Sequence, residues 1–249
     1  AIQTILELLP ESQRLTAVNL QDGEGNTILH SAARACNFEH VKGILSLLME
    51  SERLSAVGMR ESSGHTTLHY VVRSGNIESI KAILALYPES QHFQMMSTLC
   101  GRQDETALHC AVDAKNLELI KFILSLYPES QLLQAVCMKD QCQNTVLHCV
   151  AHSCDHQFMK TILEAIPEPQ RAHAMSVQDS HGNTVLACIS REDNLPSLRA
   201  ILSLLPKSQR LQIVTVRDRS EMIVLHHHAD DLYLVGTILN SLSEIDRFQ

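Results

Sequence analysis

Histidine and cysteine are the residues of this 249-residue chain whose side chains could do metal or acid–base chemistry, and the chain has 14 histidines and 8 cysteines. The densest group is His226-His227-His228, with Asp230 and Asp231 close behind. His226 and Asp230 are four residues apart, as are His227 and Asp231, and this spacing places two ligands on one face of a helix. Because histidine and carboxylate are zinc ligands, metal binding is one hypothesis for this segment.

The spacing of these candidates argues against a metal site. Three consecutive helical residues point about 100° apart, so the run of histidines does not converge on one ion. Cys137 and Cys142 are separated by four residues and form a second candidate pair. No matching second pair follows at ligand spacing. We therefore predict neither a metal nor a cofactor for this chain.

Motifs of catalysis are missing from the sequence as well. It contains no Gly-x-Ser-x-Gly elbow, no phosphate-binding glycine-rich loop and no cysteine in a nucleophile motif. With so many histidines and cysteines, some pairs will lie close together by chance, and such pairs are not evidence of a catalytic dyad. The sequence predicts a protein that is not an enzyme.

The segments that carry these residues recur at a fixed period. The pattern Thr-x-Leu-His occurs four times, and two weaker copies follow. The leucines lie at positions 29, 68, 108, 147, 186 and 225, so the steps are 39, 40, 39, 39 and 39 residues. A fixed period of this length predicts a solenoid of stacked repeats.

Each period carries the signals of three helices. The threonine can cap a first helix, which we expect over about 27–36 in the first repeat. A second helix is expected over about 38–49, because its apolar residues recur at helical spacing. A proline usually ends it. Apolar pairs such as Leu15 and Val18 then follow at a spacing of three, which predicts a short third helix in every repeat.

The turn before each first helix changes along the chain at its fourth position. Glycine occupies this position in three repeats, as Gly25, Gly64 and Gly182. A residue with a side chain replaces it in the other three, as Asp104, Gln143 and Glu221. Because glycine adopts positive φ without steric cost, we expect the last three turns to be reshaped or strained.

This pattern resembles the ankyrin repeat. The resemblance lies in Thr27-Ile28-Leu29-His30 at the start of a helix, the polar turn 22–26 before it, Ala32-Ala33 after it, and Val41-Lys42-Gly43-Ile44-Leu45 in the second helix. It covers nearly the whole chain, as a half repeat over 1–20 and six repeats that begin near 21, 60, 100, 139, 178 and 217. It implies a single all-α domain over 1–249, an ankyrin-type solenoid.

Two departures from the family pattern are regular. The proline that follows the threonine is absent from all six repeats, and the period exceeds the roughly 33 residues of a standard repeat. Expanded repeats of this kind are similar to those of ankyrin-repeat effectors that intracellular bacteria deliver into eukaryotic cells. That similarity implies a role inside a host cell.

The resemblance also implies roles for particular residues. The histidine of the repeated motif ties the turn to the start of the helix, which assigns a structural role to His30, His69, His109, His148 and His226. The family binds proteins in a concave groove formed by the turn tips and the exposed ends of the first helices. By alignment the partner-binding residues are Glu24, Asn26, Arg34, Ser63, His65, Tyr70, Arg73, Arg102, Gln103, Glu105, Asp113, Asn144, His152, His181 and Arg191. Tyrosine and arginine are the types among them that most often anchor interfaces.

Composition narrows the choice of partner and compartment. The net charge of −8 argues against nucleic acid, whose affinity depends on clustered Lys and Arg, and favours a basic protein partner. No run of 18 apolar residues is present to span a membrane, and no signal peptide opens the sequence. The cysteines follow no disulfide framework, and Cys110, Cys149 and Cys188 share one repeat position too far apart to pair. These features predict a reducing, intracellular compartment, or a host cytoplasm for a delivered effector.

The start of the sequence suggests alternatives to a self-contained binding module. Ile5-Leu6 matches the Ile-Leu pair of a second helix, so we expect the chain to begin inside a repeat and to be a fragment of something longer. The bare apolar face of that helix could drive self-association. The array could also be the targeting or regulatory domain of a larger enzyme, or a spacer between other domains.

Overall fold

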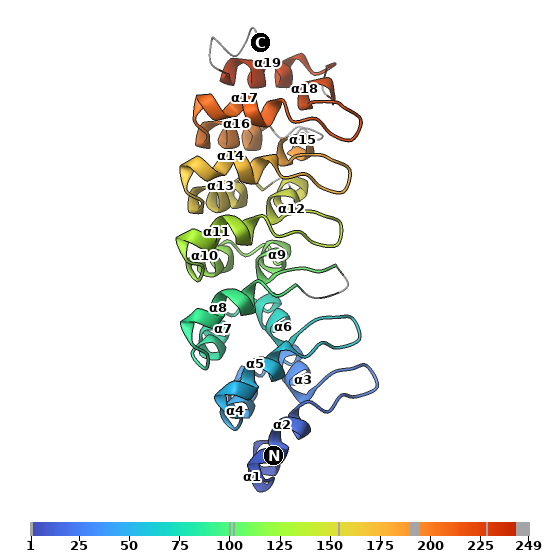
Figure 1. The fold of residues 1–249 in the computed structure, drawn as a ribbon, viewed down its shortest axis with the longest axis vertical. Coiled ribbons are helices and arrows are strands. Elements are labelled where there is room, and N and C mark those ends of the chain that lie inside the picture. The colour runs from blue at the N-terminus through green and yellow to red at the C-terminus, as the bar shows by residue number, and fades with distance from the viewer. Residues whose placement is uncertain are drawn as a thin grey trace. The chain divides into compact units, whose positions relative to one another are not determined.

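The computed structural model of the protein describes residues 2–99, 101, 103–153, 155–189, 195–227 and 229–242. Within these residues the regular elements are helices that recur in sets of three (Figure 1), and isolated bridges such as Arg60 with Thr66 close some of the turns. The predicted all-α solenoid is confirmed.

The described helices follow the predicted order, and the sixth repeat is described only through its second helix. The first helices are α3 (Ile28–Arg34), α6 (Thr67–Arg73), α9 (Ala107–Asp113), α12 (Val146–Ser153), α15 (Val185–Ile189) and α18 (Val224–His227). The second helices are α1 (Ile2–Leu8), α4 (Phe38–Ser46), α7 (Ile77–Leu84), α10 (Leu117–Ser125), α13 (His156–Ala165), α16 (Leu195–Leu204) and α19 (Leu232–Ser241). The short third helices are α2 (Glu11–Val18), α5 (Glu50–Gly58), α8 (Glu89–Met96), α11 (Glu129–Val136), α14 (Glu168–Ser176) and α17 (Lys207–Val214).

The chain forms two compact units, Ala1–Leu126 and Tyr127–Gln249. In the first unit α3 packs on α6, α6 on α9 and α4 on α7; in the second, α12 packs on α15 and α13 on α16. Between the two terminal repeats, the leucine of the repeated motif and the Ile-Leu pair of the second helix fill the core, and Leu29, Ile44 and Leu45 are fully buried. At the ends of the array Ile5 and Leu239 are exposed. That the whole chain acts as one domain stays a prediction.

The repeated histidine joins the turn to its helix, and at His30 and His148 it also joins the next repeat. His30 Nδ1 accepts the N–H of Thr27 at 3.1 Å, and Nε2 lies 3.1 Å from the carbonyl oxygen of His65 in the following turn. Because Nδ1 is an acceptor, the proton must be on Nε2, which donates to that carbonyl. His148 repeats the arrangement, with Thr145 N–H at 3.2 Å and the carbonyl oxygen of Asn183 at 3.1 Å. The predicted structural role is confirmed and extends across the repeat boundary.

Burial keeps these imidazoles neutral. It lowers the pKa of His30 and His148 below the usual value, and it lowers that of His69 to about 3. His69 Nδ1 lies 2.7 Å from the hydroxyl of Thr66. A charged imidazolium at these positions would be desolvated and would lose its acceptor at Nδ1. The helix start therefore depends on the neutral form.

The three turns without glycine keep the glycine conformation. Asp104, Gln143 and Glu221 have φ of 51°, 64° and 60°, and the glycines at the same position have φ of 79° to 87°. The turns are therefore not reshaped. The left-handed conformation costs an L-residue roughly 1–2 kcal/mol, so the strain that the sequence predicts is present at these positions.

An arginine of the third helix links neighbouring repeats, and sequence reasoning missed it. Arg53 Nε donates to the carbonyl oxygens of Leu45 and Leu48 at 3.1 and 3.3 Å, while Nη1 donates to the carbonyl oxygen of Leu86 at 3.1 Å in the next repeat. Three further arginines make equivalent bonds across a repeat boundary, namely Arg14, Arg171 and Arg210. These charged donors satisfy carbonyls that a helix end leaves without a partner.

Replacing Arg53 by Met should lower the free energy of unfolding by about 1–3 kcal/mol, because hydrogen bonds from a charged donor to helix-end carbonyls are lost. Urea unfolding followed by circular dichroism measures this. Lys121→Met is the matched control, since Lys121 makes only an exposed ion pair with Glu118 and its loss should cost about 0.5 kcal/mol or less. An equal loss of unfolding free energy in the two variants would show that the bonds of Arg53 stabilise the fold no more than an exposed ion pair does.

Mild acid should destabilise the fold through its buried histidines. A histidine whose pKa is lower in the folded chain than its ordinary 6.5 contributes its full stability above about pH 6.5 and loses it as the pH falls towards the folded value. For His69 this amounts to on the order of 1–2 kcal/mol between pH 6.5 and 5. Urea unfolding at about pH 7, 6 and 5 measures the loss.

Two variants make this test specific. His69→Gln does not titrate, so it should be less stable than the parent at pH 7 but lose less stability on acidification. His152→Gln, at an exposed position, should keep the parent's pH dependence. If His69→Gln and the parent lose stability equally, the buried imidazole is not the cause.

Candidate protein-binding site

The first unit contains a hollow of about 540 Å³ beside the turns that precede α6 and α9. It is lined by Ser63, His65, Arg73, Gln103, Glu105 and Asp113. The turns supply Ser63, His65, Gln103 and Glu105, while Arg73 and Asp113 are the last residues of α6 and α9. The alignment placed all six among the partner-binding residues, and the structure brings them together.

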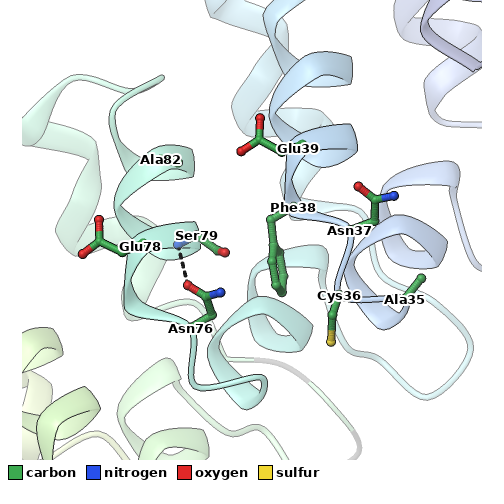
Figure 2. A pocket seen from close by; sticks show the side chains of 9 residues that line it. All are labelled: Ala35, Cys36, Asn37, Phe38, Glu39, Asn76, Glu78, Ser79 and Ala82. Carbon is green, nitrogen blue, oxygen red and sulfur yellow. Dashed lines mark hydrogen bonds between the residues drawn. The ribbon is translucent and has the colours of Figure 1, made fainter.

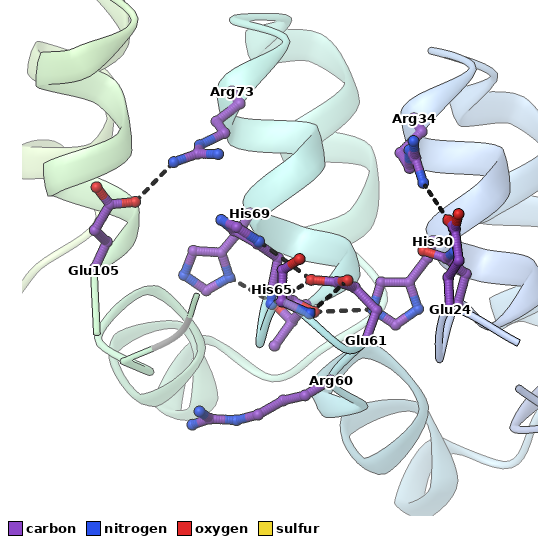
Figure 3. A network of polar contacts seen from close by, with 12 residues as sticks. Glu24, His30, Arg34, Arg60, Glu61, His65, His69, Arg73 and Glu105 are labelled. Atoms are coloured by element: carbon purple, nitrogen blue, oxygen red, sulfur yellow. Dashed lines mark hydrogen bonds and ion pairs between the residues drawn. The ribbon is translucent and has the colours of Figure 1, made fainter. Parts of the chain in front are cut away.

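An ion pair crosses this hollow between neighbouring repeats. Arg73 Nη2 donates to Glu105 Oε2 at 2.8 Å (Figure 3), and the Glu105 side chain is only 9% exposed whereas that of Arg73 is 41% exposed. Burial raises the pKa of Glu105, Arg73 counteracts it, and the neighbouring carboxylate of Asp113 raises the pKa further. Arg73 is thus paired with Glu105 and is also influenced by the charge of Asp113.

Glu61 fixes the turn that carries His65. Its Oε1 accepts the backbone N–H of His65 at 2.9 Å and lies 3.2 Å from His65 Nδ1, and its Oε2 accepts the N–H of Ser63 at 2.8 Å. Burial alone would raise the pKa of Glu61, but these hydrogen bonds outweigh it and hold the pKa below the usual range. The carboxylate therefore acts as the internal scaffold of the turn (Figure 3).

Glycine replaces this acidic residue in the third repeat. The equivalent acids of the other turns are Asp22, Asp140, Asp179 and Asp218, which accept backbone N–H groups in the same way. At Gly101 an added Cβ would lie 2.9 Å from Nε2 of His65, and φ is +75°. The His65 ring therefore occupies the space over Gly101. Sequence reasoning overlooked this position, although the loss of the acid from one repeat in six was visible.

The aromatic ring of Tyr70 lies beside His65, one of the residues that line the hollow. Its ring centroid lies 5.6 Å from that of His65 and 6.1 Å from that of His30, and the Arg34 guanidinium lies 5.9 Å from it. Arg34 also approaches Glu24 at 3.8 Å, where the two side chains are 53% and 78% exposed. This exposed ion pair contributes little to stability. It can therefore break, and both side chains can bind a partner, at low cost in free energy.

The remaining predicted residues are placed differently. Asn26 is buried, at 6% exposure, and its N–H and side chain bind Asp22, so it builds the turn and is not part of the accessible surface. Asn144 is half-buried, and His152 and His181 are exposed; all three belong to the second unit. Arg102 and Arg191 lie outside the described residues.

Two other hollows are less suited to binding. One of about 480 Å³ lies where the first repeat meets the start of α7 (Figure 2), with the Phe38 ring beside it. Its asparagines are occupied, since Asn37 and Asn76 accept backbone N–H groups as helix caps. The other, of about 370 Å³, contains Arg210 in the second unit, and this arginine is bonded to carbonyls at two repeats.

The described residues show little support for metal or thiol chemistry. They include no group of three or more His, Cys, Asp or Glu side chains placed to hold a metal ion. His226 Nδ1 accepts the N–H of Ile223 at 3.1 Å, as its role in the turn predicts, and His228 lies outside the described residues. Burial raises the pKa of Cys137 to about 11, so its thiol stays protonated near neutral pH. Cys36, Cys137 and Cys142 form no disulfide bond.

Comparison with known families agrees with this geometry. A sequence model described as ankyrin repeats (3 copies) matches residues 2–93 and 47–132, which together cover more than half of the chain. The chain belongs to the ankyrin-repeat family. No curated protein matches the sequence significantly.

The fold of these ankyrin repeats also matches a solved structure. The crystal structure of the ankyrin repeat domain of Bcl-3, described as a unique member of the IkappaB protein family, is similar with a TM-score of 0.69. The match covers 90% of this chain and 86% of that one at 14% sequence identity, so it shows the shared fold alone. In the part of the array that the structure describes, no helix has the length and apolar character needed to cross a membrane.

Proposed function

We propose that this chain is a protein-binding module that holds its partner on one surface of the first unit. This turn–helix surface consists of Glu24, Arg34, Ser63, His65, Tyr70, Arg73, Gln103, Glu105 and Asp113. Ankyrin repeat domains are typically non-catalytic modules for protein–protein interaction. The observation that carries the proposal is the hollow of about 540 Å³, which six residues chosen by alignment line together.

The turn–helix surface has the features of a preorganised interface. Tyr70 and the arginines beside it are of the types that dominate binding energy. Arg73 is held by Glu105, and Tyr70 is held between His30, His65 and Arg34, so little side-chain entropy remains to be lost on binding. The net charge of −8 supports a partner whose contact surface is basic.

The alignment also predicts partner-binding roles for Arg102 in the first unit and for Asn144, His152, His181 and Arg191 in the second. The exposed apolar residues of α1, Ile5 and Leu8, at 61% and 82% exposure, support the prediction that this helix drives self-association. A role as a bacterial effector inside a host cell is a further prediction from the repeat pattern, and an intracellular location is a prediction from the cysteines. No observation on the described residues favours the alternative of a regulatory domain of a larger enzyme.

The proposal predicts that Arg34→Glu combined with Tyr70→Ala weakens capture of the partner at least about tenfold, because two anchor side chains are lost. The measurement is a pull-down from eukaryotic cell lysate, with bound proteins quantified by mass spectrometry. Arg199→Glu combined with Tyr233→Ala is the matched control. It removes a similar pair elsewhere, in which the guanidinium lies 5.8 Å from the tyrosine ring.

Both variants must first show the circular dichroism spectrum and melting temperature of the parent. A partner that is retained by the parent and the control but lost by the Arg34/Tyr70 variant supports the proposed surface. A partner that both variants retain equally contradicts it, and so does the absence of any captured protein.

A further inference from the structure

We infer that the hollow between the second and third repeats receives a lysine or arginine side chain of the partner, with Glu105 and Asp113 as its acceptors. The inference rests on the proposed function and adds the chemistry of the group that is recognised.

Glu105 has one oxygen that the protein leaves available. Arg73 Nη2 and the thiol of Cys110 both reach Oε2, at 2.8 and 3.8 Å. No described residue donates a hydrogen bond to Oε1, although the side chain is nine-tenths buried. Figure 3 shows this second oxygen turned away from Arg73. Oε1 is not one of the buried oxygens without a partner, so it is open to a donor that enters the hollow.

The charges around the hollow are unbalanced. Arg73 is the only guanidinium among its lining residues, and it faces the two carboxylates of Glu105 and Asp113. His65 is directed to Glu61 at 3.2 Å and does not compensate them. Like charges held close together destabilise each other, so a second cation placed between the carboxylates would relieve the repulsion.

The repeat pattern places this excess of negative charge between the second and third repeats. The last residue of the first helix is Arg34 in the first repeat, Arg73 in the second and Asp113 in the third. The sign of the charge at this position therefore reverses where the hollow lies. An anionic ligand would meet only Arg73, which is already paired, whereas a cationic one meets Asp113 exposed at the rim and Glu105 below.

The hollow has room for a long basic side chain together with the partner residues that flank it. Its volume of about 540 Å³ lies within the usual range for ligand pockets, and Ser63 and Gln103 add neutral polar groups beside the carboxylates. A lysine ammonium or an arginine guanidinium offers several donors, enough to bond Oε1 of Glu105 and the Asp113 carboxylate together.

The test uses small probes of the partner's side chain and the full chain labelled with ¹⁵N. Nα-acetyl-arginine amide and Nα-acetyl-lysine amide, whose side chains are charged, should shift the backbone amide signals of Gln103, Glu105 and Asp113 saturably. The expected Kd is roughly millimolar. N-acetyl-glutamine amide, which is neutral, should shift them far less. Asp113→Asn should weaken the cationic probes at least about fivefold, because one charged acceptor is lost.

Glu118→Gln is the matched control. It removes one negative charge from the same repeat at an exposed position outside the hollow, so it should leave binding of the probes unchanged. Equal binding of the neutral and cationic probes overturns the inference, as does an equal loss in both variants or no saturable shift at all. If capture of the partner depends on Arg34 and Tyr70 but the cationic probes do not bind, the proposed function stands and this inference fails.

Discussion

The structure depends on a neutral imidazole that bridges the start of one repeat and the turn of the next. At His30 and His148 one ring nitrogen accepts the N–H of the capping threonine, and the other donates to a carbonyl 35 residues further along the chain. Each hydrogen bond is weak by itself. The threonine N–H and the carbonyl oxygen are both buried, however, and leaving either without a hydrogen bond would cost about 1–3 kcal/mol. At these two boundaries the bridge therefore ties consecutive turns together.

The bridge at His30 contributes to the candidate site. His30 holds the carbonyl of His65, which places the His65 ring over Gly101 in the next turn and beside Tyr70. Arg73 then reaches Glu105 across the boundary between two repeats. The third helices brace the repeats elsewhere through arginines such as Arg53. The hollow is thus a product of how repeats are stacked, and no single repeat contains it.

Periodic features could be predicted from the sequence, and features that depend on exact backbone positions could not. The spacing of the leucines and the prolines predicted the three helices of the first five repeats, and alignment found the six residues that line the hollow. Arg53 was missed because its partners are carbonyls, which no residue type reveals. Asn26 was expected on the surface, but its bonds to Asp22 bury it. The strain at Gln143 was foreseen, whereas the unchanged shape of its turn was not.

The central claim is that the bridging histidines are neutral and protonated on Nε2. The most direct measurement is the ¹⁵N chemical shift of the imidazole nitrogens in histidine-labelled protein at about pH 6, with His30→Gln and His148→Gln used to assign the signals. The account predicts a neutral ring at both positions, with the proton on Nε2 and Nδ1 unprotonated. A charged ring, or a proton on Nδ1, would contradict it, because Nδ1 could then not accept the N–H of Thr27 or Thr145.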